Sequence, residues 1–282
     1  MPIYDQGYRR YEARGPLRTL RFWPITREAL RLVLSRRAFL GLLAVGWLPF
    51  VVRVIQIYIV TRFPEAGRVL PVDGRLFGEY LNTQIGLALF LTIFGGAGLI
   101  ANDLRTGAIL VYLSRPLTRR DYVLGKLSVL LALNASVTLV PALLLYGIGL
   151  ALAPEQYMTW SLWWIGPAIV LHATLICVSI SLLSLAVSSL TKSARIAGLG
   201  FFGLFVGLEM ARGVLRNIFD VRGATLLSIQ ADLRGIGSAL FGVTPSRFDL
   251  VDWPAAALVL LLVAAGCLLL LRWRVRAVEI VR

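Results

Sequence analysis

The sequence predicts an all-α integral membrane protein with six transmembrane helices. Of its 282 residues, 58% are hydrophobic and only 16% are charged, and the mean hydropathy of +0.78 lies outside the range of ordinary soluble domains. The apolar residues fall into blocks of about 18 or more, the length that a helix needs to cross the hydrocarbon core of a bilayer. We expect spans at residues 38–60, 83–101, 127–152, 162–190, 193–211 and 254–271.

The distribution of charge predicts how these spans are oriented. Four segments lie on one side of the predicted bundle: residues 1–37, 102–126, 191–195 and the stretch from 272 onward. They carry 20 of the 29 Lys and Arg residues and 6 of the 15 Asp and Glu residues, which accounts for the whole net charge of +14. Because loops rich in Lys and Arg stay in the cytoplasm, we expect both termini to be cytoplasmic in a multi-pass protein of the plasma (inner) membrane. The lipid bilayer, with its anionic headgroups, suffices as the partner of this charge, so we expect no nucleic acid.

We expect a single membrane domain, because the chain has no long internal repeat and no low-complexity linker. The predicted parts are a cytoplasmic N-terminal segment at 1–37, the six-span domain at 38–271 and a cytoplasmic tail at 272–282. Within the domain, a basic loop at 102–126 joins the second and third spans, and an outer segment at 212–253 joins the fifth and sixth.

An amphipathic helix is predicted shortly before the first span. Pro24 suits the first turn of a helix, and the side chains after it divide at helical spacing into an apolar and a polar face. The apolar face holds Phe22, Ile25, Ala29, Leu32 and Val33, and the polar face holds Arg27, Glu28, Arg31 and Ser35. We expect this helix to lie along the inner membrane surface. Its spacing leaves lipid anchoring and a role in coupling to a partner equally open.

The outer segment at 212–253 is half apolar in its middle, yet this middle contains Asp232, Arg234 and four glycines, at 223, 235, 237 and 242. Such a stretch makes a poor spanning helix, because irregular backbone at membrane depth must be covered by protein. We expect a re-entrant or interfacial pair of helices there.

Residues of the kinds that enzymes use are sparse. His172 is the only histidine and has no Cys, Asp or Glu at i±3 or i±4, so a structural role is favoured over that of a ligand or base. The only Gly-Lys pair, Gly125 and Lys126, lacks the other residues of a phosphate-binding P-loop. Cys177 and Cys267 lie inside predicted spans and suit apolar packing. We therefore expect no catalytic residue, metal or cofactor in this chain.

Two charged residues, Arg53 and Glu209, lie toward the outer ends of predicted spans. Charge inside a membrane is costly and often functional, although long side chains near a span end can reach the interface. We take a pair between these two residues, or contact of either with a substrate, as a hypothesis.

The stretch "GLIANDLRTGAILVYLSRPLTRRDYVLGKL" at 98–127 predicts a folded element. Pro116 ends a helix before it, and Thr118 with Asp121 predicts a capping box that starts the next helix at Arg119. Upstream, 103–114 can extend the second span as a short helix. Its apolar knot, "ILVYL", has no core of its own to enter, so it suits docking on another protein, with burial against the membrane surface as the alternative.

This stretch resembles the membrane permeases of ABC exporters of the second type, the ABC-2 transporters. In that family the loop after the second span typically runs Glu, three residues, Gly-Thr, an apolar knot, Ser-x-Pro-hydrophobic-Ser/Thr-Arg and then Gly-Lys. Here the pattern is Asp103, Gly107-Ala108, "ILVYL", "SRPLTRRDY" and Gly125-Lys126, with Asp for Glu and Ala108 for Thr as mild departures. The six spans, the basic N-terminal helix and the broken outer segment also fit, so the resemblance covers nearly the whole chain.

The resemblance implies a transport subunit that is not itself an enzyme. Family members pair two permeases, identical or homologous, with two separate ATPase subunits that use ATP and Mg²⁺, and the short loop helix sits in the ATPase as a coupling helix. By this resemblance, the ATPase-coupling interface would comprise Asp103, Arg105, Gly107, Ile109, Tyr112, Arg115, Pro116, Arg119 and Arg120, with Arg27, Glu28 and Arg31 of the N-terminal helix. Gly203 and Gly207 have the spacing of close helix packing, which suits contact with a second permease.

Two alternatives to an ABC exporter permease stay open. One is an ABC-type membrane subunit that drives membrane assembly or signalling, and the other is a membrane enzyme or channel outside the family. The spans display no selective ring of charge, so the sequence does not indicate a substrate.

Overall fold

A computed structural model of the chain describes residues 22–63, 65, 73–113, 117–152, 163–219, 222–243 and 252–274. Over these residues the protein is all-helical. Among these residues, six helical segments are long and apolar enough to cross a membrane, as the sequence predicts.

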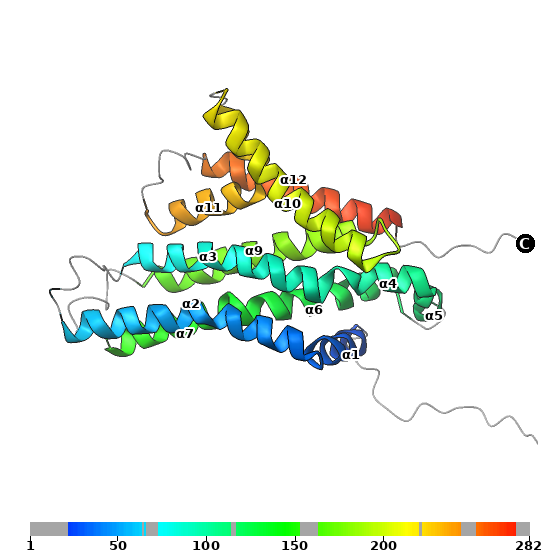
Figure 1. The fold of residues 1–282 in the computed structure, drawn as a ribbon, viewed down its shortest axis with the longest axis horizontal. Coiled ribbons are helices and arrows are strands. Elements are labelled where there is room, and N and C mark those ends of the chain that lie inside the picture. Colours follow the sequence, from blue (N-terminus) through cyan, green and yellow to red (C-terminus); the bar gives the residue numbers. More distant parts are fainter. Residues whose placement is uncertain are drawn as a thin grey trace, which may run out of the picture.

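Each span is one helix or two consecutive helices. The spans are α2 (Arg37–Arg62), α3 (Gly74–Gly96) continued by α4 (Gly98–Thr106), α6 (Arg119–Val137) continued by α7 (Leu139–Leu152), α9 (Ile165–Ser188), α10 (Ala194–Asn217) and α12 (Trp253–Arg274). The shorter helices are α1 (Trp23–Leu34), α5 (Ala108–Leu113), the 3-10 helix η2 (Arg222–Leu227) and α11 (Ile229–Leu240). Figure 1 shows α1, α4 and α5 at one end of the molecule and α11 toward the other.

Two spans begin earlier than the hydropathy pattern predicts. The second starts at Gly74, because Asp73 caps it by accepting a hydrogen bond from the Arg75 backbone N–H (2.9 Å). The third starts at Arg119. Both extra stretches carry charged residues, so hydropathy falls there although the helix continues toward the membrane surface.

The helix α9 forms the centre of the bundle. It packs against α3, α6, α7, α10 and α12. Of its most apolar 18-residue stretch, 67% is buried inside the protein. The peripheral helix α2 is also strongly apolar, but only 11% of its most apolar stretch is buried inside the protein. A helix that is apolar but unburied by protein needs lipid around it, so the outer ring of helices faces the bilayer.

Polar side chains join α3, α6 and α9 inside this bundle. The amide of Asn134 donates to the Thr92 hydroxyl (2.9 Å) and to the Ser181 hydroxyl (3.1 Å). Ser188 donates to the carbonyl of Ala97 (2.7 Å), at the point where α3 gives way to α4. Within a membrane, such bonds hold helices in register.

The outer segment forms two short helices, η2 and α11, where the sequence predicts a helical pair. Ser228 caps α11 by accepting a hydrogen bond from the Ala231 N–H (3.2 Å). With 12 residues, α11 is too short to cross a bilayer. It packs against α3, α9 and α12.

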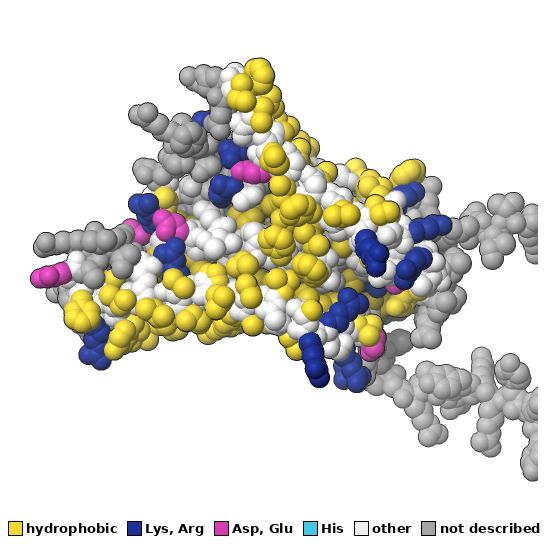
Figure 2. Space-filling view, in the orientation of Figure 1, with side chains coloured by type: hydrophobic (Ala, Val, Ile, Leu, Met, Phe, Trp, Pro, Cys, Tyr) yellow, Lys and Arg dark blue, Asp and Glu magenta, His cyan; other side chains and the backbone are white. Residues whose placement is uncertain are grey.

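The surface has the pattern of a membrane-embedded protein. Figure 2 shows hydrophobic side chains across the middle of one face, with Lys and Arg gathered toward the two ends. The apolar band matches the hydrocarbon region, and the charges match the two interfaces.

Candidate functional site

The candidate coupling interface lies at the end of the molecule formed by α1, α4, α5 and the start of α6 (Figure 1). Gly107 ends α4 with a φ of 70°, a left-handed conformation that glycine adopts without steric cost. This turn separates α4 from α5 and sets the direction of the short helix.

The capping box that the sequence predicts is confirmed. The Thr118 hydroxyl accepts from the Asp121 N–H (3.2 Å), and the Asp121 carboxylate accepts from the Thr118 N–H (2.9 Å). Together the two bonds satisfy free backbone and side-chain groups at the helix start, so α6 begins at Arg119. Arg115 and Pro116, also predicted for the interface, lie outside the described residues.

A buried ion pair ties α4 to α6. The ammonium of Lys126 lies 2.8 Å from the Asp103 carboxylate, and their side chains are only 6% and 16% exposed. The Tyr122 hydroxyl donates to the same carboxylate oxygen (2.7 Å), and the Lys126 ammonium lies 5.7 Å from the centre of the Tyr122 ring. The cluster therefore links α4 to α6, and removing one partner of the pair would leave an uncompensated, almost buried charge.

The apolar knot on α5 is partly internal, which corrects the expectation that it has no core to enter. Ile109 is only 6% exposed and packs with the fully buried Tyr122. The Tyr112 ring lies 5.6 Å from the Tyr122 ring. The turn at Gly107 brings α5 against the first turns of α6, so Ile109 faces this chain's own core and is not presented to a partner.

The remaining described cations of the predicted interface are exposed. Arg105 lies on the last turn of α4, and Arg119 and Arg120 lie on the first turn of α6. On α1, the side chains of Arg27, Glu28 and Arg31 are also exposed. The structure thus brings the predicted surface residues of α1, α4 and α6 to one end of the molecule, with Asp103 and Ile109 beneath them.

The helix α1 is fixed on α6 by a close backbone approach. The Thr26 hydroxyl donates to the carbonyl of Gly125 (3.1 Å), and a Cβ at Gly125 would lie 3.1 Å from the Ile25 side chain. The buried face of α1 includes Thr26, whereas Leu32 is 58% exposed. The face of α1 that packs against the protein therefore includes Ile25 and Ala29, and Leu32 lies outside it. The expected contact of the apolar face with the membrane surface stays a prediction.

A known protein family matches a segment of the chain that includes the candidate coupling interface. A family model described as "ABC-2 family transporter protein" matches residues 80–219. The chain belongs to the ABC-2 transporter family. The match runs from α3 to α10 and so includes α4, α5 and the start of α6. No curated protein matches the chain.

Membership makes this protein a multi-pass membrane transport subunit, a permease of the ABC-2 type. Such permeases are not themselves catalytic and normally work in a lipid bilayer with an ATPase partner.

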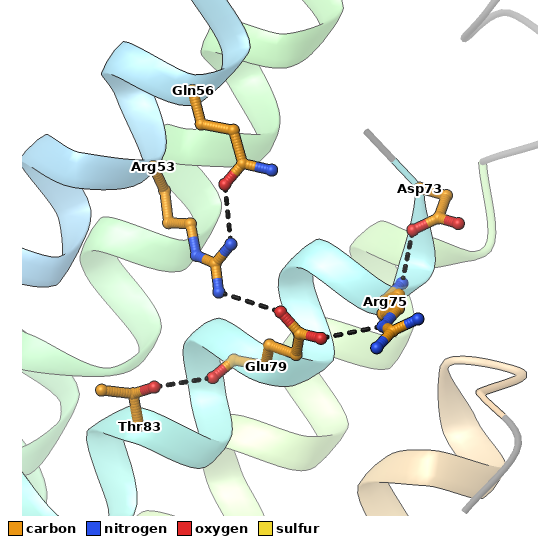
Figure 3. A network of polar contacts seen from close by, with 6 residues as sticks. All are labelled: Arg53, Gln56, Asp73, Arg75, Glu79 and Thr83. Atoms are coloured by element: carbon orange, nitrogen blue, oxygen red, sulfur yellow. Dashed lines mark hydrogen bonds and ion pairs between the residues drawn. The ribbon is translucent and has the colours of Figure 1, made fainter. Parts of the chain in front are cut away.

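In this ABC-2 permease, Arg53 and Glu209 do not pair with each other, so the predicted pair is wrong. Contact of either residue with a substrate stays a prediction. Figure 3 shows Arg53 of α2 bonded to Gln56 (2.7 Å) and to Glu79 of α3 (3.1 Å). Glu79 also pairs with Arg75 one turn earlier (2.8 Å). Because α2 packs directly against α3, Arg53 finds a carboxylate on its neighbouring helix.

Glu209 instead holds the outer segment of the permease to α10. Its carboxylate pairs with Arg212 (2.7 Å) and with Arg234 of α11 (3.1 Å). It also accepts a hydrogen bond from Ser228, the residue that caps α11. This cluster positions α11 beside α10.

His172 joins α9 to α11. Its Nε2 lies 3.0 Å from the Leu233 carbonyl, and its ring lies edge-on to Phe241 at 5.8 Å. A Cβ at Gly237 would come within 2.5 Å of the His172 ring. These contacts support the structural role that the sequence favours for this histidine.

Lys126, Tyr122 and Glu79 were not identified from the sequence as partners in the ion pairs and hydrogen bonds of the structure. Tyr122 and Lys126 are four residues apart, so they share one helix face, and both lie in the segment that carries the family resemblance. That spacing was a usable signal. Glu79 lies between the predicted first and second spans, where no local pattern indicates it as the partner of Arg53.

Proposed function

We propose that this permease is the transmembrane subunit of an ATP-driven exporter and that a separate ATPase moves it through residues 102–126, the coupling element. The observation that carries the proposal is the buried Asp103–Lys126 pair with Tyr122. It joins the two helices that flank α5, so a force on α5 reaches both.

Two routes lead from the coupling element across the membrane. The helix α4 continues α3, and together they run from Gly74 to Thr106. The helix α6 is continued by α7, and together they run from Arg119 to Leu152. Displacement of the coupling element would tilt both spans as one unit, because the ion pair holds their ends together.

Exposed cations surround this element. Arg105, Arg119 and Arg120 on one side, and Arg27 and Arg31 of α1 on the other, present positive charge at one end of the molecule. An acidic cleft on the ATPase would complement this surface. ATP and Mg²⁺ would bind to that ATPase, and the basic end of the permease would be cytoplasmic.

The helix α10 supports the proposal of a second permease copy as a partner. Leu199 and Met210 are 72% and 68% exposed, and a Cβ at Gly203 or Gly207 would meet no atom within 4 Å. Figure 1 shows that the outer part of α10 stands away from the other spans. A small-residue face of this kind allows close helix approach.

Co-purification tests the coupling role. The full chain is tagged and isolated gently from its native membrane, and its partners are identified by mass spectrometry. We expect a P-loop ATPase, and we expect two double variants, Arg119→Glu with Arg120→Glu and Arg27→Glu with Arg31→Glu, to reduce its recovery at least tenfold.

The matched control is Lys192→Glu with Arg195→Glu, which makes the same charge change on two exposed residues, one in the turn after α9 and one in the first turn of α10. This variant should retain the ATPase. If all three double variants recovered the same amount of ATPase, or if no P-loop subunit co-purified in several detergents, the proposed function would be contradicted.

A further inference from the structure

A groove of about 390 Å³ opens between the first turns of α6 and the last turns of α12. It lies at the end of the permease that carries α1 and α5, because α6 begins and α12 ends there. Its chemistry divides into an apolar floor and wall and a cationic rim.

The floor and wall of the groove are built from leucines of both helices. Leu271 is 1% exposed and packs with the buried side chain of Leu130. Leu124 and Leu268, next to it, are each about half exposed. Both helices pack against α9, so the groove between them is closed behind and open toward the surroundings.

Three arginines form the rim: Arg119, Arg120 and Arg272. All three are exposed, and within the described part of the chain none forms an ion pair or a hydrogen bond with an acidic side chain. The nearest acid along the chain, Asp121, caps α6 through Thr118. The groove therefore gathers three positive charges beside an apolar surface, with no described counter-charge on them.

Arg274, which lies near the groove, differs from the three rim arginines because it has hydrogen-bond partners within the chain. Two residues beyond Arg272, its guanidinium donates to the carbonyls of Ser189 (3.3 Å) and Leu190 (3.2 Å) at the end of α9. Arg274 thus anchors α12 to the bundle, whereas Arg272 is left to bind something outside the chain.

We propose that this groove binds an anionic glycerophospholipid of the basic-side leaflet. The phosphate pairs with the guanidinium groups, whose planar donors match phosphate oxygens. One acyl chain runs along Leu124, Leu268 and Leu271. A soluble anion would use the rim but leave the apolar wall uncovered, so the combination favours a lipid.

The inference goes beyond the proposed coupling to an ATPase and does not depend on it. Arg119 and Arg120 belong to both surfaces, but Arg272 and Leu268 lie outside the coupling element. Substitutions at these two positions therefore separate lipid binding from ATPase binding.

Native mass spectrometry of the full chain, released from nanodiscs of equal parts phosphatidylglycerol and phosphatidylcholine with identical acyl chains, tests the site. We expect phosphatidylglycerol to be retained in excess. Because one basic residue near an anionic lipid changes affinity about fivefold, Arg272→Gln should lower that excess about fivefold. Arg195→Gln, an equal change on an exposed arginine outside the groove, should leave the excess unchanged.

Two further arms identify the occupant as a lipid. Leu268→Trp, at a half-exposed position, fills the groove while keeping every charge, and it should also lower phosphatidylglycerol retention. Glycerol phosphate, the soluble headgroup, should not displace the lipid at millimolar concentration. Equal retention of the two lipids by the unmodified chain, an equal effect of Arg195→Gln and Arg272→Gln, or displacement by glycerol phosphate would overturn the inference.

Discussion

At the scale of single residues, the permease is organised by charge pairs that sequence proximity does not reveal. Lys126 pairs with Asp103 and Arg53 with Glu79, across 23 and 26 residues of chain. The Thr118–Asp121 capping box could be predicted, because its partners are three residues apart within one motif. The distant pairs depend on which helices pack together, and the sequence does not supply that information.

The Asp103–Lys126 pair should be required for the stability of this end of the molecule. Lys126→Met removes one charge and leaves the Asp103 carboxylate almost buried, so we expect a loss of about 3 kcal/mol in unfolding free energy. Adding Asp103→Leu should restore most of the loss, since no charge then stays uncompensated. Thermal unfolding of the single and double variants in one detergent measures the coupling between the sites.

Tyr122→Phe is the control for this cycle. It removes one hydrogen bond to a carboxylate and keeps the ion pair, so it should cost about 1.5 kcal/mol. If Lys126→Met is no more destabilising than Tyr122→Phe, the ion pair does not link the two helices.

Gly237 should not accept a side chain. Its added Cβ would lie 2.5 Å from the His172 ring, which is fully buried between α9 and α11. We expect Gly237→Ala to destabilise the protein by about 1–3 kcal/mol through overpacking. Gly203→Ala, in open space on α10, should not lower monomer stability, and equal melting temperatures for the two variants would show that α11 does not pack as described.

At the scale of elements, the existence of the helices could be predicted, and the capping box also gave the start of α6 at Arg119. Most other helix ends and the packed faces could not be predicted. Hydropathy located all six spans, yet it placed the starts of the second and third too late, because Glu79 and Arg119 lie on helix that extends beyond the apolar core. The burial of Ile109 depends on the left-handed turn at Gly107, which directs α5 onto α6. The sequence marks the glycine but not the direction of the following helix.

The short helix α11 should make stability depend on pH through Asp232. Within the described residues, this fully buried carboxyl has no hydrogen-bond partner, and burial raises the pKa of Asp232 to about 7. Between about pH 4 and 7 the folded protein therefore binds more protons than the unfolded chain, and stability falls as pH rises through that window.

Asp232→Asn removes the titrating group while keeping its shape. We expect this variant to lose part of the decline in melting temperature between pH 5 and pH 8 and to exceed the unmodified protein in stability at pH 8. An unchanged pH profile would show that another group controls the dependence.

At the scale of the whole molecule, a well-packed centre is surrounded by helices that face outward. The buried share of the most apolar stretch falls from 67% in α9 to 22% in α10 and α12. We propose a different partner for each exposed surface: an ATPase for the basic end, a second permease for the face of α10, and a lipid for the groove beside α12. None of these partners is part of the chain, so their identities lie beyond what its own sequence and fold determine.

Site-directed photo-cross-linking tests the central claim most directly. Cys177 and Cys267 are buried, so a cysteine introduced as Arg105→Cys on the exposed end of α4 can be labelled selectively with a maleimide-benzophenone. Arg75→Cys, an exposed position at the opposite end of the same span, serves as the control. The account predicts that illumination of the purified complex joins the ATPase subunit to the label at position 105 and not at position 75. Cross-linking from position 75 alone, or from neither position in a complex that contains the ATPase, would contradict it.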